Sequence, residues 1–179
     1  MDARPREPLR RYFAGIAEYT FHTQLGVADI QVIDYITDLL TRFIRSDVVF
    51  KIRNLTGLPL TEVAAMLIEA EERIGDARRE VHRHVGDFTL FWTGVYPEAL
   101  HRLRDESRKD HLLEYREQGK RSYRIASAIK TDEQQTNAPG ALLGRMSEQF
   151  DLLAYGLGEV RRQWEHRGDN NLPQPIILN

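Results

Sequence analysis

Cysteine is absent from this chain of 179 residues. Its absence excludes thiol nucleophiles, iron–sulfur clusters, disulfide bonds and zinc sites built from cysteine. Small secreted domains often depend on disulfides, so a chain without them is more typical of the cytoplasm. We therefore expect a cytoplasmic protein.

The chain also lacks an excess of either charge and any long apolar run. It contains 25 basic and 27 acidic side chains, for a net charge of −2, and this balance does not indicate a nucleic-acid partner. Its longest uncharged stretches, such as residues 88–97, are much shorter than the roughly 18 apolar residues of a membrane span. We expect neither a nucleic-acid partner nor a membrane-embedded protein.

Hydrophobic residues make up 41% of the chain, which is enough for a core without a metal or disulfide. We predict one helical bundle domain over residues 1–169. Residues 170–179 form a Pro-containing tail whose Ile176, Ile177 and Leu178 are apolar. Such a tail is expected to dock on this chain or on a second copy.

Apolar residues recur every three or four positions along most of the chain, which is the pattern of amphipathic helices. The predicted helices span residues 9–25, 29–44, 61–88 with an extension to 94, a short segment from 97, 107–129 and 141–164. Residues 47–60 suit either a strand or a helix, and we favour helix or irregular chain because no second strand is evident. The predicted fold class is all-α, a single antiparallel helical bundle of five or six helices.

Several residues are placed to begin or end these helices. Asp29, Thr61 and Ser107 are of the types that cap helix N-termini, and each precedes a periodic apolar segment. Gly26 and Gly94 follow such segments and are expected to end them. The polar residues 131–140 form the clearest loop.

The long predicted helix carries Asp76, Glu80 and His84 at intervals of four, so the three side chains share a face. Carboxylates and imidazoles on bundle helices bind metal pairs in di-metal proteins, but those sites use Glu-x-x-His, which this helix does not contain. His82 and His84 lie two positions apart and so face different directions on a helix. We favour a solvated face and predict no metal site, with Asp76, Glu80 and His84 as the weak candidates.

Aromatic residues are densest between positions 87 and 96. This cluster predicts either a ligand pocket or, as we favour, a corner between helices filled by large side chains. The ligand-pocket candidates are His22, His84, Asp87, Trp92 and Tyr96.

A basic stripe occupies the helix predicted at 107–129. Arg116, Lys120 and Arg124 follow each other at steps of four, and tyrosines flank them. A phosphate-bearing partner is one interpretation. We favour a solvated face balanced by an acidic neighbour, for which the acidic side of the long helix is one candidate.

The last predicted helix contains small residues, among them Gly140, Gly144, Ala154 and Gly158. Glycine weakens a helix unless a close backbone approach requires it. We therefore expect close packing against another helix, and a symmetric partner is one candidate for that helix.

No sequence motif for a familiar nucleophile or nucleotide site is present: Gly-x-Ser-x-Gly, the phosphate-binding loop and the dinucleotide-binding glycine pattern are all missing. Our leading hypothesis is a non-catalytic protein without a cofactor that acts through protein–protein contacts, as a homodimer or other homo-oligomer. The alternative is a bundle that binds a metal or small ligand, or an enzyme, with its site near Glu80, His84 and residues 87–96.

Overall fold

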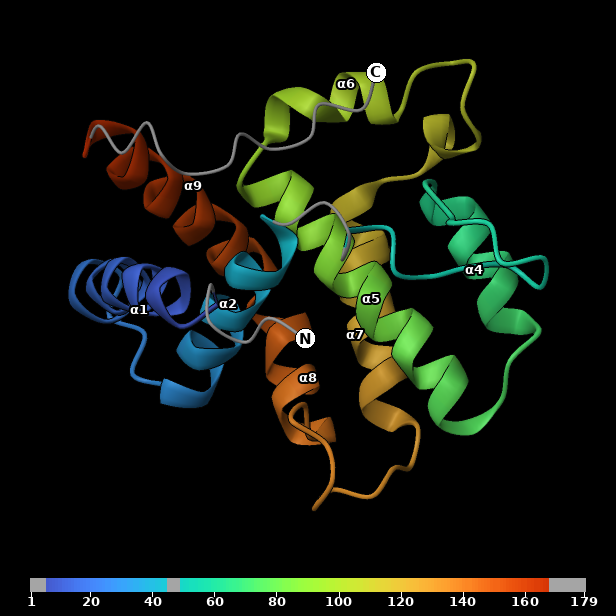
Figure 1. The fold of residues 1–179 in the computed structure, drawn as a ribbon, viewed down its shortest axis with the longest axis horizontal. Helices are drawn as coiled ribbons and strands as arrows, with labels where there is room; N and C mark the ends of the chain where they lie inside the picture. Colours follow the sequence, from blue (N-terminus) through green and yellow to red (C-terminus); the bar gives the residue numbers. More distant parts are fainter. Residues whose placement is uncertain (1–5, 45–48, 168–179) are drawn as a thin grey trace.

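The computed structural model describes residues 6–44 and 49–167, which form helices and loops without a β-strand (Figure 1). The all-α prediction is confirmed for this part of the chain. Its α-helices are α1 (Arg6–Ala17), α2 (Ile30–Phe43), α4 (Val63–Glu71), α5 (Gly75–Gly94), α6 (Leu100–Leu103), α7 (Tyr115–Ala128), α8 (Gly140–Glu148) and α9 (Phe150–His166). Three shorter helical segments are η1 (Glu18–Gln24), η2 (Pro97–Ala99) and η3 (Lys109–Leu112). The described ranges thus hold eight α-helices where we predicted five or six.

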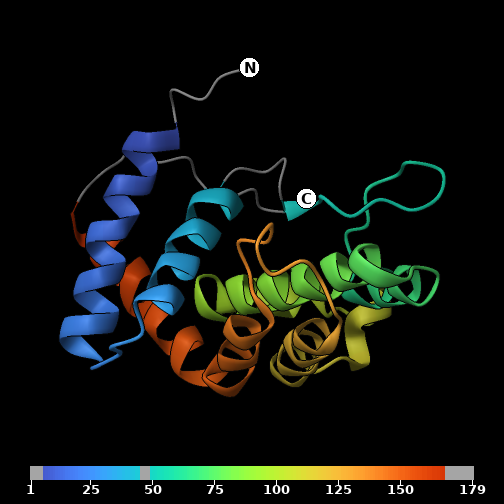
Figure 2. The same ribbon diagram turned by 90° about the horizontal axis from the view of Figure 1, so that it is seen from below.

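Helix α5 runs through the centre of the molecule. It packs against α7 along its length, with α4 beside it and with α2 and α9 toward its other end (Figures 1 and 2). All residues of α5 from position 81 to 94 are buried. A helix that is covered on every side normally carries apolar residues all round. Because α5 also carries charged and polar residues, those residues need partners from the helices around them.

Two predicted helices are each divided in the structure. The helix predicted over 61–88 separates into α4 and α5, because Ile74 is extended and Gly75 adopts a φ of +55°. A left-handed φ is accessible to glycine without a Cβ clash, and it reverses the direction of the chain. The helix predicted over 141–164 is divided at Gln149, which leaves the helical ψ range at 9°. The apolar period continues across both breaks, so the period alone does not reveal them.

Helix capping agrees with the prediction at one site and differs at two. The Asp29 side chain accepts a hydrogen bond from the Val32 backbone N–H at 3.2 Å and begins α2 as predicted. Thr61 and Ser107 were wrong predictions of caps. The buried carboxylate of Asp110 instead accepts from the first backbone N–H groups of α4, those of Val63 at 2.9 Å and Ala64 at 2.8 Å. Residues 105–114 form turns and the short segment η3, and α7 begins only at position 115.

The expected ends at Gly26 and Gly94 are confirmed. Gly26 has a φ of +69° and follows η1, and α5 ends at Gly94. Residues 51–62 are irregular chain with one isolated antiparallel bridge between Arg53 and Pro59, in agreement with the expectation of helix or irregular chain for residues 47–60. Residues 47 and 48 of that segment, and the tail at 170–179, lie outside the described residues.

The small residues of α9 allow close packing inside this chain. A Cβ on Gly158 would lie 3.5 Å from the Gly94 carbonyl oxygen, and a Cβ on Gly94 would lie 2.9 Å from the carbonyl oxygen of Ala154. A Cβ on Gly156 would meet the ring of Phe21. The helix that α9 approaches is therefore α5, so this pattern does not require a symmetric partner.

Within residues 6–44 and 49–167, no helix combines the length and the apolar character needed to cross a membrane.

Two glycines test the packing of α7 and α8. A Cβ on Gly119 would overlap the Phe150 ring and Thr89 Oγ1, whereas a Cβ on Gly144 would meet nothing within 4 Å. We expect Gly119→Ala to lower the free energy of unfolding by about 1–3 kcal/mol through overpacking. Gly144→Ala, the control, is expected to raise it by about 0.5–1 kcal/mol through its helix preference. Urea denaturation measures both, and equal effects of the two variants would contradict this packing.

Candidate functional site

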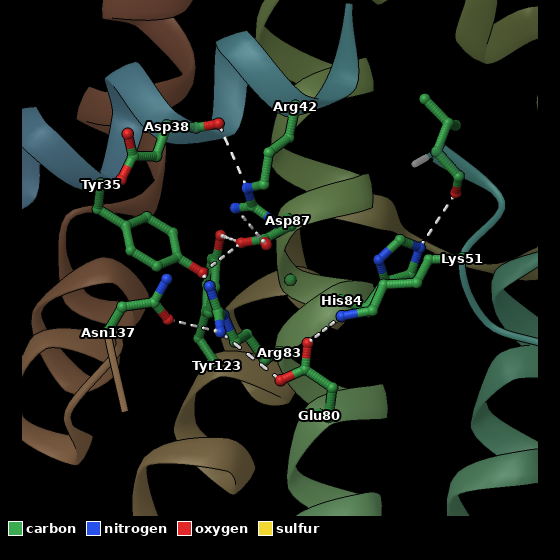
Figure 3. A network of polar contacts seen from close by, with 12 residues as sticks. Tyr35, Asp38, Arg42, Lys51, Glu80, Arg83, His84, Asp87, Tyr123 and Asn137 are labelled. Atoms are coloured by element: carbon green, nitrogen blue, oxygen red, sulfur yellow. Dashed lines mark hydrogen bonds and ion pairs between the residues drawn. The ribbon is translucent and has the colours of Figure 1, made fainter. Parts of the chain in front are cut away.

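A buried carboxylate lies at the meeting point of α2, α5 and α7. Asp87 of α5 is 1% exposed. Its Oδ1 accepts hydrogen bonds from the hydroxyls of Tyr35 at 2.6 Å and Tyr123 at 2.7 Å, and its Oδ2 accepts one from Arg42 Nη2 at 3.1 Å (Figure 3). Both oxygens are thus satisfied by side chains from two other helices. A Cβ on Gly86 would lie 2.6 Å from the Tyr123 ring, so this glycine lets α7 come close.

The partners of Asp87 keep it charged. Burial by itself raises the pKa of Asp87, but Arg42, Arg83 and the two tyrosine hydroxyls outweigh burial, and its pKa lies below the ordinary value. Burial and the charge of Asp87 raise the pKa of Tyr35, which therefore stays protonated and donates. The site holds a fixed negative charge at neutral pH.

Arg83 lies one helical turn before Asp87 and is also held on several sides. Its Nε donates to the Tyr35 hydroxyl at 3.0 Å and its Nη1 donates to Asn137 Oδ1 at 3.2 Å. Its guanidinium also lies 5.4 Å from the centre of the Tyr35 ring. Burial lowers the pKa of Arg83, but Tyr35 and Asp87 raise it by more, so the guanidinium stays charged. These contacts fix its orientation.

Both arginines border a cavity of about 290 Å³ between α2, α5 and the loop that precedes α8. The lining residues are Gln31, Asp34, Tyr35, Asp38, Arg42, Arg83, Thr136, Asn137, Pro139 and Leu142. Arg10 of α1 pairs with Asp38 at 2.8 Å. Asp87 does not line the cavity and lies behind Arg42 and Tyr35. The cavity therefore presents two guanidinium groups: that of Arg42 is held by the Asp87 carboxylate, and that of Arg83 by Tyr35 and Asn137.

His84 is close to this network but is occupied by another contact. It is 2% exposed, and its Nε2 donates to the Val49 carbonyl oxygen at 3.1 Å. Its ring stacks on Phe43 with centroids 5.6 Å apart. Burial lowers the pKa of His84 to about 4, so the imidazole is neutral at pH 7.

The expected solvated face of the long helix is confirmed for Asp76, which is exposed, and Glu80 is half-buried. It is wrong for His84, which is buried together with the neighbouring Arg79 and Arg83. Glu80 pairs with Lys51 at 2.6 Å on the side of α5 that approaches residues 49–51 (Figure 3). Asp76, Glu80 and His84 are not brought together as ligands, and the described ranges contain no group of three or more His, Asp or Glu side chains that could hold a metal ion.

The other predicted pocket residues lie apart from the cavity. Trp92 and Tyr96 are buried in ring contacts, with centroids 6.0 Å apart, and Arg161 lies 4.6 Å from the centre of the Tyr96 ring. This matches the packed corner that we favoured for residues 87–96. His22 is exposed on η1 and its Nδ1 donates to the Val27 carbonyl oxygen at 3.3 Å. Of the predicted pocket residues, Asp87 and His84 lie nearest the cavity.

The basic stripe of α7 has an acidic neighbour within the fold. Asp151 of α9 pairs with Arg116 at 3.2 Å and with Lys120 at 2.8 Å. The acid thus comes from α9, whereas the long helix was our candidate. Arg124 is exposed on the same helix.

Sequence reasoning missed Tyr35, Arg42, Arg83, Tyr123 and Asn137 as site residues. A signal was present in α5, where from position 81 onward Arg83 and Asp87 alternate with the apolar Val81, Val85 and Phe88 and the sequence shows no separate polar face. Two opposite charges on a helix that is apolar on the remaining faces indicate a buried pair or network, because an unpaired buried charge is costly. The partners of that pair come from distant segments and follow no sequence spacing.

No protein-family model, curated protein or solved structure matches this chain. Its function is therefore argued from the geometry of its own residues.

Removal of the central charge tests this network. Asp87→Asn leaves two arginines without their buried counter-charge, and we expect the free energy of unfolding to fall by about 3–5 kcal/mol. Asp151→Asn, which breaks exposed ion pairs on α9, is the matched control and is expected to cost about 1 kcal/mol or less. Denaturant titration at pH 7 measures both. Equal losses for the two variants would contradict a central role for Asp87.

The pH dependence of stability tests the burial of His84. An unfolded histidine titrates near pH 6.5, whereas the pKa of His84 in the folded chain is about 4. Between these values only the unfolded chain binds the proton, so stability falls as the pH drops from 6.5 to 4, by at most about 3 kcal/mol. We expect His84→Gln, which can still donate to Val49, to reduce this fall.

The matched control is His111→Gln, because His111 is exposed. Unfolding curves are measured from pH 7 to pH 4 for the wild type and both variants. A pH profile of His84→Gln that is parallel to the wild type would contradict a buried, neutral His84.

Proposed function

We propose that this protein binds a small organic anion, a carboxylate or phosphate compound, in the cavity between α2, α5 and the loop at residues 131–139. The observation that carries the proposal is the pair Arg42 and Arg83, which border a cavity of about 290 Å³. Asp87 holds Arg42 from behind, and Tyr35, which itself donates to Asp87, holds Arg83. Guanidinium groups are the side chains best suited to carboxylates and phosphates, because their N–H groups match two oxygens at once.

Preorganisation supports binding at this cavity. Arg83 is restrained by Tyr35 and Asn137, and Arg42 by Asp87 and by the Asp38 carbonyl oxygen, to which its Nε donates at 3.3 Å. A side chain that is already ordered loses little conformational entropy when a ligand arrives. Asn137 also places the loop before α8 at the cavity wall.

The charges around the cavity favour a ligand that is more than a bare anion. Asp34 and Asp38 line the same cavity, and Arg10 pairs with Asp38. A molecule with a carboxylate toward the arginines and a hydroxyl or ammonium group toward Asp34 has a partner for each end. Amino and hydroxy acids are therefore the first compounds to test.

The protonation states favour binding over catalysis. General acid–base catalysis works best with a group whose pKa lies near the working pH. The pKa values of Tyr35, Arg42 and Arg83 are all raised, and the imidazole of His84 has a pKa of about 4 and donates to Val49. These groups hold fixed protons at pH 7, which suits recognition and supports the expectation of a non-catalytic protein.

Two earlier expectations stay proposals of lower rank. Homo-oligomer formation rested on the apolar tail and on the small residues of α9, and Gly94 within this chain already faces those small residues. The tail at residues 170–179 remains the basis for that prediction. A cytoplasmic location rests on the missing cysteines.

Calorimetric titration with inorganic phosphate, succinate, malate and aspartate, with succinamide as the neutral comparison, tests the proposal. At a ligand concentration 100 times Kd, we expect the free energy of unfolding to rise by about 2.7 kcal/mol. Arg42→Met is expected to weaken binding about tenfold or more, because a charged hydrogen bond is lost. Arg116→Met removes an exposed arginine on α7 and is the control.

Two results would contradict the proposal: equal affinity for succinamide and the acids, or equal affinity of Arg42→Met and Arg116→Met for the acids. Recovery of a chemically altered ligand after incubation would overturn the non-catalytic part alone.

A further inference from the structure

A second cavity, of about 250 Å³, lies between α4, α5 and α7, where α4 is on the other side of α5 from α2 (Figure 1). Its lining residues are Leu67, Ile68, Glu71, His82, Gln118, Arg121 and Ile125. None of them lines the first cavity. The two cavities are therefore independent features of the fold.

His82 is the unusual residue of this cavity. It is 2% exposed, and neither ring nitrogen has a hydrogen-bond partner among the described residues. A neutral imidazole has one donor and one acceptor, and leaving both unpaired in a buried position costs free energy. On the same helix His84 is partnered by Val49 and Asp87 by Tyr123. Trp92 Nε1 and Thr93 Oγ1 also lack a partner among the described residues, but neither residue lines this cavity. Since His82 lines a cavity, a partner from outside the chain is the natural completion.

The surroundings define the chemistry of that partner. Leu67, Ile68 and Ile125 provide aliphatic walls on α4 and α7. The charged groups that act on His82 are Arg78, Arg121 and Glu71, and Glu71 pairs with Arg78 at 3.1 Å. Arg121 is left as the uncompensated positive charge of this group.

We propose that this cavity binds a short aliphatic carboxylic acid, with its chain against Leu67, Ile68 and Ile125 and its carboxylate accepting the N–H of His82 near Arg121. The volume limits the size of the acid, because pockets for drug-sized ligands run from about 300 to 1,000 Å³. The carboxylate of the ligand accepts a hydrogen bond from the N–H of His82, and the positive charge of Arg121 balances the negative charge of the ligand.

Hexanoate, hexanol and hexylamine separate the parts of this proposal, because they share a chain and differ in the head group. Each is titrated into the full chain by calorimetry. We expect saturable one-to-one binding of hexanoate, binding of hexanol that is about tenfold or more weaker, and no binding of hexylamine. A hexylamine affinity equal to that of hexanoate would overturn the carboxylate assignment.

Two variants locate the binding. His82→Leu removes the unpaired ring and places an apolar residue in the core, and Arg121→Ala changes an exposed side chain. Both are expected to weaken hexanoate binding about tenfold or more. Arg124→Ala, one turn further along α7 and outside the cavity lining, is the matched control. Hexanoate binding that persists unchanged in His82→Leu would overturn the site.

The variant Arg42→Met shows how much of the hexanoate binding depends on the first cavity. Because the two cavities share no residue, we expect the hexanoate binding that depends on His82 to keep its wild-type affinity in this variant, whereas hexanoate bound at the first cavity is weakened. If hexanoate fails to bind the wild-type chain at all, the cavity around His82 holds only water and the proposal is wrong, whatever the outcome for the first cavity.

Discussion

The negative charge of Asp87 is buried in the middle of a helix that is covered on every side, and this sets the arrangement of the helices around it. A carboxylate removed from water needs opposite charges and hydrogen-bond donors close by, or it takes up a proton. Arg42 and Tyr35 meet this need from α2, and Tyr123 meets it from α7. The relative positions of three helices are thereby tied to one side chain.

The same constraint extends from α5 to the loops. Arg79 is buried and donates to the carbonyl oxygens of Ala126 at the end of α7 and Ala138 in the following loop. Arg83 donates to Asn137 in that loop, and His84 donates to Val49 in the segment after α2. Charged and polar groups of one central helix thus position the segments that enclose the first cavity. Of the residues of this helix that line a cavity, His82 is the one to which the described part of the chain offers no partner.

The sequence predicted the features that depend on neighbouring residues and missed those that depend on contacts between distant residues. The apolar period and the cap at Asp29 act within a few residues, and both were confirmed. The break at Gly75 was missed because the period continues across it, and Thr61 was a wrong cap because the distant Asp110 caps α4 instead. Asp87 was singled out for the site, but its surroundings were interpreted as an aromatic corner, since Arg42 and Tyr35 are some 50 positions away.

By itself the sequence determined that the described chain is helical, because a three-to-four-residue period can bury its apolar face only as a helix. It also determined the helix end at Gly26, because the left-handed backbone of that glycine is a local property. Only the tertiary structure decided which polar residues are buried together. That choice depends on which distant side chains reach one desolvated carboxylate, and neither charge nor spacing along the chain encodes it.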